Sequence, residues 1–176
     1  MKTNPFENPI VVSEDKWLTA RRELLREEKE FTKLRERLAA RRRELPWVKV
    51  DKRYVFESPA GPVTLADLFD SRSQLVVYHF MLGPGWGEGC KSCSYVVDHL
   101  APAVVHLHAR DVAFAAISHA SLAEITPFKE RMGWSFNWVS SHGSDFNHDY
   151  QVSFTPEELA KGKVYYNYGM TEFPSE

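Results

Sequence analysis

Residues 74–82 constrain the fold of this chain most strongly, because they form an almost unbroken apolar run, QLVVYHFML. A strand whose two faces are both apolar is typical of the buried parallel sheets of α/β proteins. After it the sequence predicts a helix over 95–108, a strand over 111–118, a helix over 121–133 and a strand over 136–140. Strands that alternate with helices in this way predict an α/β fold with a mainly parallel sheet.

Shorter elements are expected on both sides of this central pattern. We expect short strands at 48–50 and 54–56 and a capped helical turn at 64–69. A further helix starts at 155–158, and a last strand follows at 164–168. The sequence shows neither an internal repeat nor a low-complexity segment.

The N-terminal part is predicted to hold an extended arm over 1–12 and one long helix. Ser13 is a typical helix cap, the arginines at 41–43 suit the C-terminal end of the helix dipole, and Pro46 stops the helix. An apolar residue recurs every seven positions, at Trp17, Leu24, Phe31, Leu38 and Leu45. A helix of about 30 residues reaches about 45 Å, which exceeds the diameter of a small domain. Two interpretations stay open: the helix lies across its own domain, or it overhangs and grips a second copy, so that residues 1–45 mediate a homodimer.

The composition sets limits on the class of protein. With 176 residues, 43% hydrophobic and 13% aromatic, the chain has enough apolar material for one sizeable core. Its net charge of −2 does not indicate a nucleic-acid partner. The first residues lack the apolar segment of a secretory signal, and no run approaches the ~18 apolar residues of a membrane span. We therefore expect no membrane partner and a location in the reducing cytoplasm, where stable structural disulfides are rare.

The only two cysteines, Cys90 and Cys93, are separated by two residues. A disulfide between them closes too small a loop to stabilise the fold much. Redox or metal chemistry is the better interpretation of this pair.

The surroundings of the pair favour redox chemistry. Cys90 follows a glycine-rich loop after the predicted strand, which places it at the start of a helix. The unpaired N–H groups and the dipole at that position favour a thiolate, and Lys91 adds a positive charge that Glu88 opposes. Cys93 comes one turn later on the same face. The sequence predicts that Cys90 attacks a substrate disulfide and that Cys93 resolves the mixed disulfide.

A metal site is the weaker alternative. His79, His99, His106 and His108 are possible further ligands beside the two thiols. However, residues two apart on a helix point in nearly opposite directions, so His106 and His108 do not converge if that stretch is helical. We expect no metal and no cofactor.

Two further features lie near the predicted site. Trp86 either shapes a substrate groove over the thiols or anchors the glycine loop in the core, and the second use is commoner. The polar segment 140–150 follows a strand, so Asp145, His142 or His148 could accept a proton from the thiols at the same end of the sheet. A turn held by local hydrogen bonds is the plainer interpretation of this segment.

Four stretches resemble a known bacterial family. They are GWGEGCKSCS at 85–94, ARDV at 109–112, FKERMGW at 128–134 and WVSSHGSDFN at 138–147. The family is a domain-of-unknown-function family of predicted thioredoxin-like dithiol–disulfide oxidoreductases, and the similarity runs from the N-terminal helix to about Tyr168. The resemblance implies a thioredoxin-like central mixed sheet flanked by helices over 46–176, with Cys90 and Cys93 as the redox pair. The resemblance does not supply the substrate, which we expect to be a disulfide of a protein or small molecule. We expect Trp86, Lys91, Ser92 and Asp145 to support them.

The chain departs from that fold at its C-terminal end. Thioredoxin-like folds finish with a hairpin, whose first strand follows a cis-proline facing the cysteines, and a last helix. Here either residues 164–168 take the place of part of this unit or the chain is shortened, which would leave a sheet edge and Cys90 exposed. Two alternatives to the oxidoreductase stay open: a non-catalytic module that binds a metal or a partner, and a peroxiredoxin-related peroxidase, although no Thr-x-x-Cys motif surrounds Cys90.

Overall fold

The computed structural model describes residues 9–172 and divides the chain into two compact units, of which one ends at Val50 and the other begins at Asp51. Residues 1–8 of the predicted arm lie outside the described part. Each unit is described by itself below.

The first unit consists of one long helix, α1 (Glu14–Arg43), as predicted. Ser13 occupies the N-cap position, but its side chain makes no capping hydrogen bond. None of the helix side chains is buried. The apolar residues that recur every seven positions are exposed to solvent; Trp17 is 57% exposed and Phe31 is 60% exposed. The homodimer through this helix stays a prediction.

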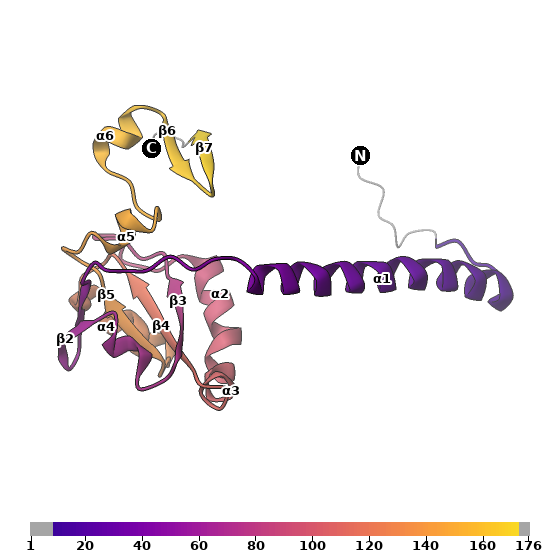
Figure 1. Ribbon diagram of the computed structural model, residues 1–176, viewed down its shortest axis with the longest axis horizontal. Coiled ribbons are helices and arrows are strands. Elements are labelled where there is room, and N and C mark those ends of the chain that lie inside the picture. The colour runs from indigo at the N-terminus through magenta and orange to yellow at the C-terminus, as the bar shows by residue number, and fades with distance from the viewer. Residues whose placement is uncertain (1–8, 173–176) are drawn as a thin grey trace. The chain divides into compact units, whose positions relative to one another are not determined.

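The second unit is built on a five-stranded mixed sheet with strand order β2-β1-β5-β4-β3 (Figure 1). Its strands are β1 (Val55–Ser58), β2 (Gly61–Thr64), β3 (Gln74–His79), β4 (Val112–Ser118) and β5 (Asn137–Ser140). β3, β4 and β5 are parallel, and β1 pairs antiparallel with both β5 and β2. The expected α/β fold with a central mixed sheet, flanking helices and a long N-terminal helix is confirmed. β3 forms one edge of this sheet.

Helices and short turns connect the strands. They are η1 (Asp67–Phe69), α2 (Lys91–Leu100), η2 (Ala101–Ala103), α3 (Val104–His108), α4 (Leu122–Met132), α5 (Phe146–Asp149) and α6 (Pro156–Ala160). The capping box of Ser121 and Glu124 begins α4, and Gly133, with a φ of 70°, ends it in the left-handed conformation.

Apolar side chains form a separate core on each face of the sheet. The core beneath α2 and α4 is largely aromatic and contains Phe80, Phe114, Phe128, Trp134, Phe136 and Trp138, together with Cys93 and Val97 of α2. The opposite core joins Phe56 of β1 and Leu68 of η1 to Phe146 of α5. Because successive strand residues point to opposite faces, Tyr78 and Phe80 belong to the α2 face, whereas Val77 belongs to the other.

Three sequence predictions of secondary structure are wrong in detail. Residues 48–50 form no strand, and β2 at Gly61–Thr64 was not expected. The helix predicted over 95–108 begins earlier, at Lys91, and is broken by a 3₁₀ turn that contains Pro102. Proline lacks the N–H group that would continue the α-helix, which explains the break.

The C-terminal strand prediction is met by a hairpin of β6 (Lys163–Tyr166) and β7 (Gly169–Glu172). This hairpin forms its own two-stranded sheet and does not extend the central one. Among residues 9–172, no helix combines the length and the apolar character needed to cross a membrane.

Candidate functional site

The cysteine pair lies where β3 ends and α2 begins. The N–H of Cys90 donates to the carbonyl of Met81 at 2.9 Å, which ties the start of α2 to the chain leaving β3. Cys90 is the N-cap residue of α2, and Cys93 lies one turn into the helix. Both are free thiols; Cys90 is half-buried, and Cys93 is only 7% exposed and packs in the aromatic core.

Hydrogen bonds to the sulfur of Cys90 lower the pKa of its thiol below the ordinary value. The strongest comes from the backbone N–H of Cys93, and partial burial opposes it. The backbone of Ser92 and the side chains of Cys93 and Ser92 lower this pKa further. These donors are the unpaired groups of the first helical turn, so they stabilise a thiolate at Cys90.

Of the residues predicted to support the pair, Ser92 is brought directly to it. Lys91 is exposed and is not among the groups that lower the Cys90 pKa. Asp145 accepts a hydrogen bond from Lys52 at 2.8 Å, and Lys52 also binds Asp149 at 2.6 Å. Asp145 therefore helps to hold the segment before β1 against α5.

The glycine loop between β3 and α2 is fixed to α4 at two points. The N–H of Gly85 donates to the Glu124 carboxylate at 2.7 Å, and Glu88 pairs with Arg131 at 3.2 Å. Trp86 is 54% exposed and lies over the backbone of Gly83, so the prediction that it anchors the loop in the core is wrong. The loop is held by Glu124, by the Glu88–Arg131 ion pair and by the packing of Gly89 on Phe80.

The predicted histidines do not converge on the cysteines. His79 stacks on Phe146 of the opposite core with ring centroids 5.4 Å apart, and burial lowers its pKa. His99 is bound to the carbonyl of Tyr95 at 2.7 Å on α2, and His106 and His108 lie on α3.

His142 and His148 flank a third imidazole that the sequence analysis did not single out. His119, which follows β4, lies with its ring centroid 6.2 Å from that of His142 and 6.1 Å from that of His148. Burial, followed by the charges of His148 and His142, lowers the pKa of His119. No group of three or more histidine, cysteine or acidic side chains in residues 9–172 has the geometry to hold a metal ion.

Two residues of the site were missed from the sequence. Tyr78 packs against the core that holds the cysteines, where burial, followed by the Cys93 side chain, raises its pKa, and Glu124 holds the loop through Gly85. The alternation of side chains along 74–82 could have placed Tyr78 on the helix-covered face together with Phe80. Glu124 was recognised only as part of a helix cap.

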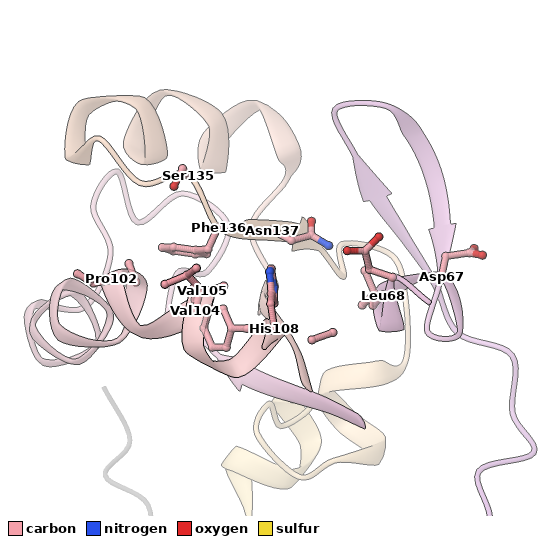
Figure 2. A pocket seen from close by; sticks show the side chains of 13 residues that line it. Asp67, Leu68, Pro102, Val104, Val105, His108, Ser135, Phe136 and Asn137 are labelled. Atoms are coloured by element: carbon pink, nitrogen blue, oxygen red, sulfur yellow. The ribbon is translucent and has the colours of Figure 1, made fainter. Parts of the chain in front are cut away.

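A cavity of about 460 Å³ lies at the other end of the parallel strands (Figure 2). Its lining includes Ala113 at the start of β4, Asn137 at the start of β5, His108 and Asp67. Cys90 follows the carboxyl end of β3, where ligands bind in open α/β sheets, whereas this cavity lies at the amino ends. It is therefore separate from the cysteine site.

The comparison with curated proteins finds no match for this chain. A family model described as "Bacterial protein of unknown function (DUF899)" matches residues 6–175, which is almost the whole sequence. The chain therefore belongs to the DUF899 family of bacterial proteins.

Proposed function

We propose that this protein is a thiol–disulfide oxidoreductase that works through Cys90 and Cys93, in a domain of thioredoxin-like type. The observation that carries the proposal is the set of donors around Cys90. Cys90 is half-buried at a helix start, and the backbone N–H groups of Cys93 and Ser92, together with the Cys93 side chain, lower the pKa of its thiol. A thiolate with a second thiol one turn away is the arrangement that disulfide exchange requires.

The reaction follows from the positions of the two sulfurs. The Cys90 thiolate attacks one sulfur of a substrate disulfide, and the other substrate sulfur leaves and takes up a proton. Cys93 then loses its proton and attacks the sulfur of Cys90, which releases the second substrate thiol. The substrate is reduced to two thiols while the cysteine pair is oxidised to one disulfide. The same steps in reverse oxidise a dithiol substrate.

Exposure supports the division of labour between the two cysteines. Cys90 is half-buried at the start of α2, whereas Cys93 is 7% exposed and is covered by the aromatic core. A bulky disulfide therefore reaches Cys90 more readily than Cys93. The exposed indole of Trp86, four residues before Cys90, is available to contact such a substrate.

Two serine variants test the proposal and control each other. Cys93→Ser keeps the attacking thiol and loses the resolving one, so it should accumulate a mixed disulfide with oxidised glutathione that mass spectrometry detects at Cys90. Cys90→Ser carries the same chemical change on the same helix and should accumulate little or none. Both variants should lose the reduction of insulin disulfides by dithiothreitol that the unmodified protein catalyses.

The outcomes that contradict the proposal are specific. If either variant reduces insulin as well as the unmodified protein does, the cysteine pair is not the catalyst. A stoichiometric metal ion in protein purified without chelator, lost on either substitution, would instead indicate a binding module. The cytoplasmic location expected from the sequence suits this chemistry and stays a prediction.

A further inference from the structure

Apolar side chains form one stripe along the whole of α1. The stripe follows the spacing of a coiled coil, in which residues three and four apart lie on one face of the helix. Its members are Trp17, Ala20, Leu24, Phe31, Leu34 and Leu38. The five large side chains among them are 40–60% exposed. An exposed apolar stripe of this kind marks a contact surface.

Charged side chains of α1, in contrast, find partners on the same helix. Arg21 pairs with Glu28 at 2.9 Å, and Lys33 pairs with Glu30 at 2.8 Å. These ion pairs run along the helix surface and bury none of its apolar side chains. Within the described part of its unit, residues 9–50, α1 therefore pairs its charges but leaves its apolar stripe uncovered.

We propose that α1 pairs with α1 of a second copy of this chain in an antiparallel two-stranded coiled coil. The helix has 30 residues and is about 45 Å long, so the pair has about four heptads of contact. The pairing is independent of the proposed chemistry of the cysteines. The orientation and the register follow from the charges on the helix.

A parallel orientation would bring like charges together. Two positions of the stripe are charged, Glu27 and Arg41. In a parallel pair each of them would face its own copy on the partner subunit. The acidic first turn, Glu14 and Asp15, would lie beside the partner's acidic turn, and the basic last turn, residues 41–43, would lie beside the partner's basic turn. Like charges at such positions repel, so the parallel pair is disfavoured along its whole length.

The antiparallel orientation replaces these contacts with attractive ones. Setting Leu24 against Leu34 of the partner subunit fixes the register, because each step up one helix is a step down the other. The acidic first turn then lies beside the basic last turn of the partner subunit at both ends of the pair. Glu23 lies beside the partner's Arg37. Charges of opposite sign flanking the stripe set the orientation of a coiled coil.

The same register gives each position of the stripe a suitable neighbour. The layers, each of which occurs twice, are Leu24–Leu34, Ala20–Leu38, Glu27–Phe31 and Trp17–Arg41. The stems of Glu27 and Arg41 are apolar, so their methylene groups cover an aromatic ring while their charges reach solvent. The guanidinium of Arg41 can also lie over the indole of Trp17.

Like charges that remain near the middle of the pair are already compensated. Glu28 and Glu30 face their own copies, but each is paired with a cation of its own helix. Arg21 lies near the partner's Arg35. Arg21 is bound by Glu28, and the guanidinium of Arg35 lies 6.0 Å from the ring centroid of Phe31. The attraction at the two ends therefore decides the orientation.

Sedimentation equilibrium of the full chain under reducing conditions tests the pairing, and the unmodified protein should show twice the mass of one chain. Leu24→Glu disrupts two layers of the dimer and should raise its dissociation constant about tenfold for each layer, or about 100-fold in all. Leu25→Glu is the matched control, because the same change is made at the next residue, which lies about 100° around the helix and off the stripe. It should change the dissociation constant by less than about twofold.

A distance between spin labels tests the orientation. The label is attached to Ser13→Cys in a chain that also carries Cys90→Ser and Cys93→Ser, so that the new thiol alone reacts. Ser13 precedes α1 and its side chain makes no capping hydrogen bond. In the antiparallel pair the two labels lie at opposite ends, about 45 Å apart. In a parallel pair they would lie within about 20 Å, the width of two helices.

Three results would overturn the proposed pairing. A single-chain mass at every protein concentration would show that α1 does not pair with a second copy. Equal effects of Leu24→Glu and Leu25→Glu would show that the stripe is not the contact, since Leu and Glu have similar helix propensities and both variants keep the helix. A short distance between the labels would show a parallel pair. None of these results bears on the cysteine chemistry, which the serine variants test separately.

Discussion

The packing of Gly89 gives a sharp prediction about the residue that precedes the attacking cysteine. A Cβ atom added at Gly89 would lie 2.6 Å from Cε1 and 2.9 Å from Cζ of Phe80, and 3.1 Å from Cε1 of Phe128. Phe80 is 2% exposed, and its ring centroid lies 4.5 Å from that of Trp138. The ring has no space to move into, so the chain at Gly89 and Cys90 must shift in Gly89→Ala.

The magnitude follows from two opposing effects. Overpacking a core costs about 1–3 kcal/mol, while the reduced freedom of the unfolded chain returns about 0.4–1 kcal/mol. We expect Gly89→Ala to lower the free energy of unfolding by about 1–2 kcal/mol. For a chain of this length that corresponds to a fall in melting temperature of about 2–8 °C.

Gly83→Ala is the matched control. Its added Cβ would lie 2.8 Å from Nε1 and 2.9 Å from Cε2 of Trp86, an overlap similar to that at Gly89. Trp86 is 54% exposed, so its indole can swing into solvent. We expect the stability of this variant to stay within about 0.5 kcal/mol of the unmodified protein.

Chemical denaturation followed by tryptophan fluorescence measures both variants, and the rate of alkylation at Cys90 reports the position of the thiol. Gly89→Ala should also slow alkylation, because Cys90 follows directly and its N–H is bound to Met81. Equal stability of Gly89→Ala and Gly83→Ala would refute the argument that the burial of the contacted ring decides the cost.

Two further predictions concern stability. Ser118→Ala should cost about 1–3 kcal/mol in denaturant unfolding, because the buried hydroxyl donates to the carbonyl of Phe80 at 2.7 Å and accepts from the indole of Trp138 at 3.0 Å; a change below about 0.5 kcal/mol would contradict this account. Burial, and after it the hydrogen bond to Asp149, raises the pKa of Tyr54 to about 12. Because an unfolded tyrosine titrates near pH 10, the stability that Tyr54 contributes is complete below about pH 10 and is lost as the pH rises towards 12. Tyr54→Phe should therefore weaken the dependence of unfolding free energy on pH in that interval, and an identical slope in both proteins would disprove the link.

The hydrophobic pattern was sufficient for the central elements. The apolar runs that became β3 and β4 and the capped helix α4 lie within a few residues of their predicted positions. Burial on two faces, helix caps and glycine stops are local properties, so they can be read along the chain. The same local pattern placed Cys90 at the start of a helix, which the structure confirms for α2.

The local sequence pattern gave wrong predictions where a strand depends on a partner strand for its formation. Residues 48–50 alternate apolar and polar side chains, as a strand does, but a strand forms only when another strand pairs with it. Gly61 and Pro62 carry no strand pattern of their own, yet they pair with Ser58 and Glu57 in the β1–β2 hairpin. The order of residues along the chain does not show which strand edges of the sheet are available for pairing.

The chain's own residues thus determine an α/β sheet with a thiol pair at a helix start, because periodicity, capping and chain order act over a few residues. Only the tertiary structure decides which side chains meet that pair. It brings Tyr78 of β3 into the core that holds the two cysteines, turns His79 into the opposite core, and pairs Asp145 with Lys52, 93 positions away in the sequence. Such contacts depend on how separate elements pack against one another, and that packing is a property of the whole domain.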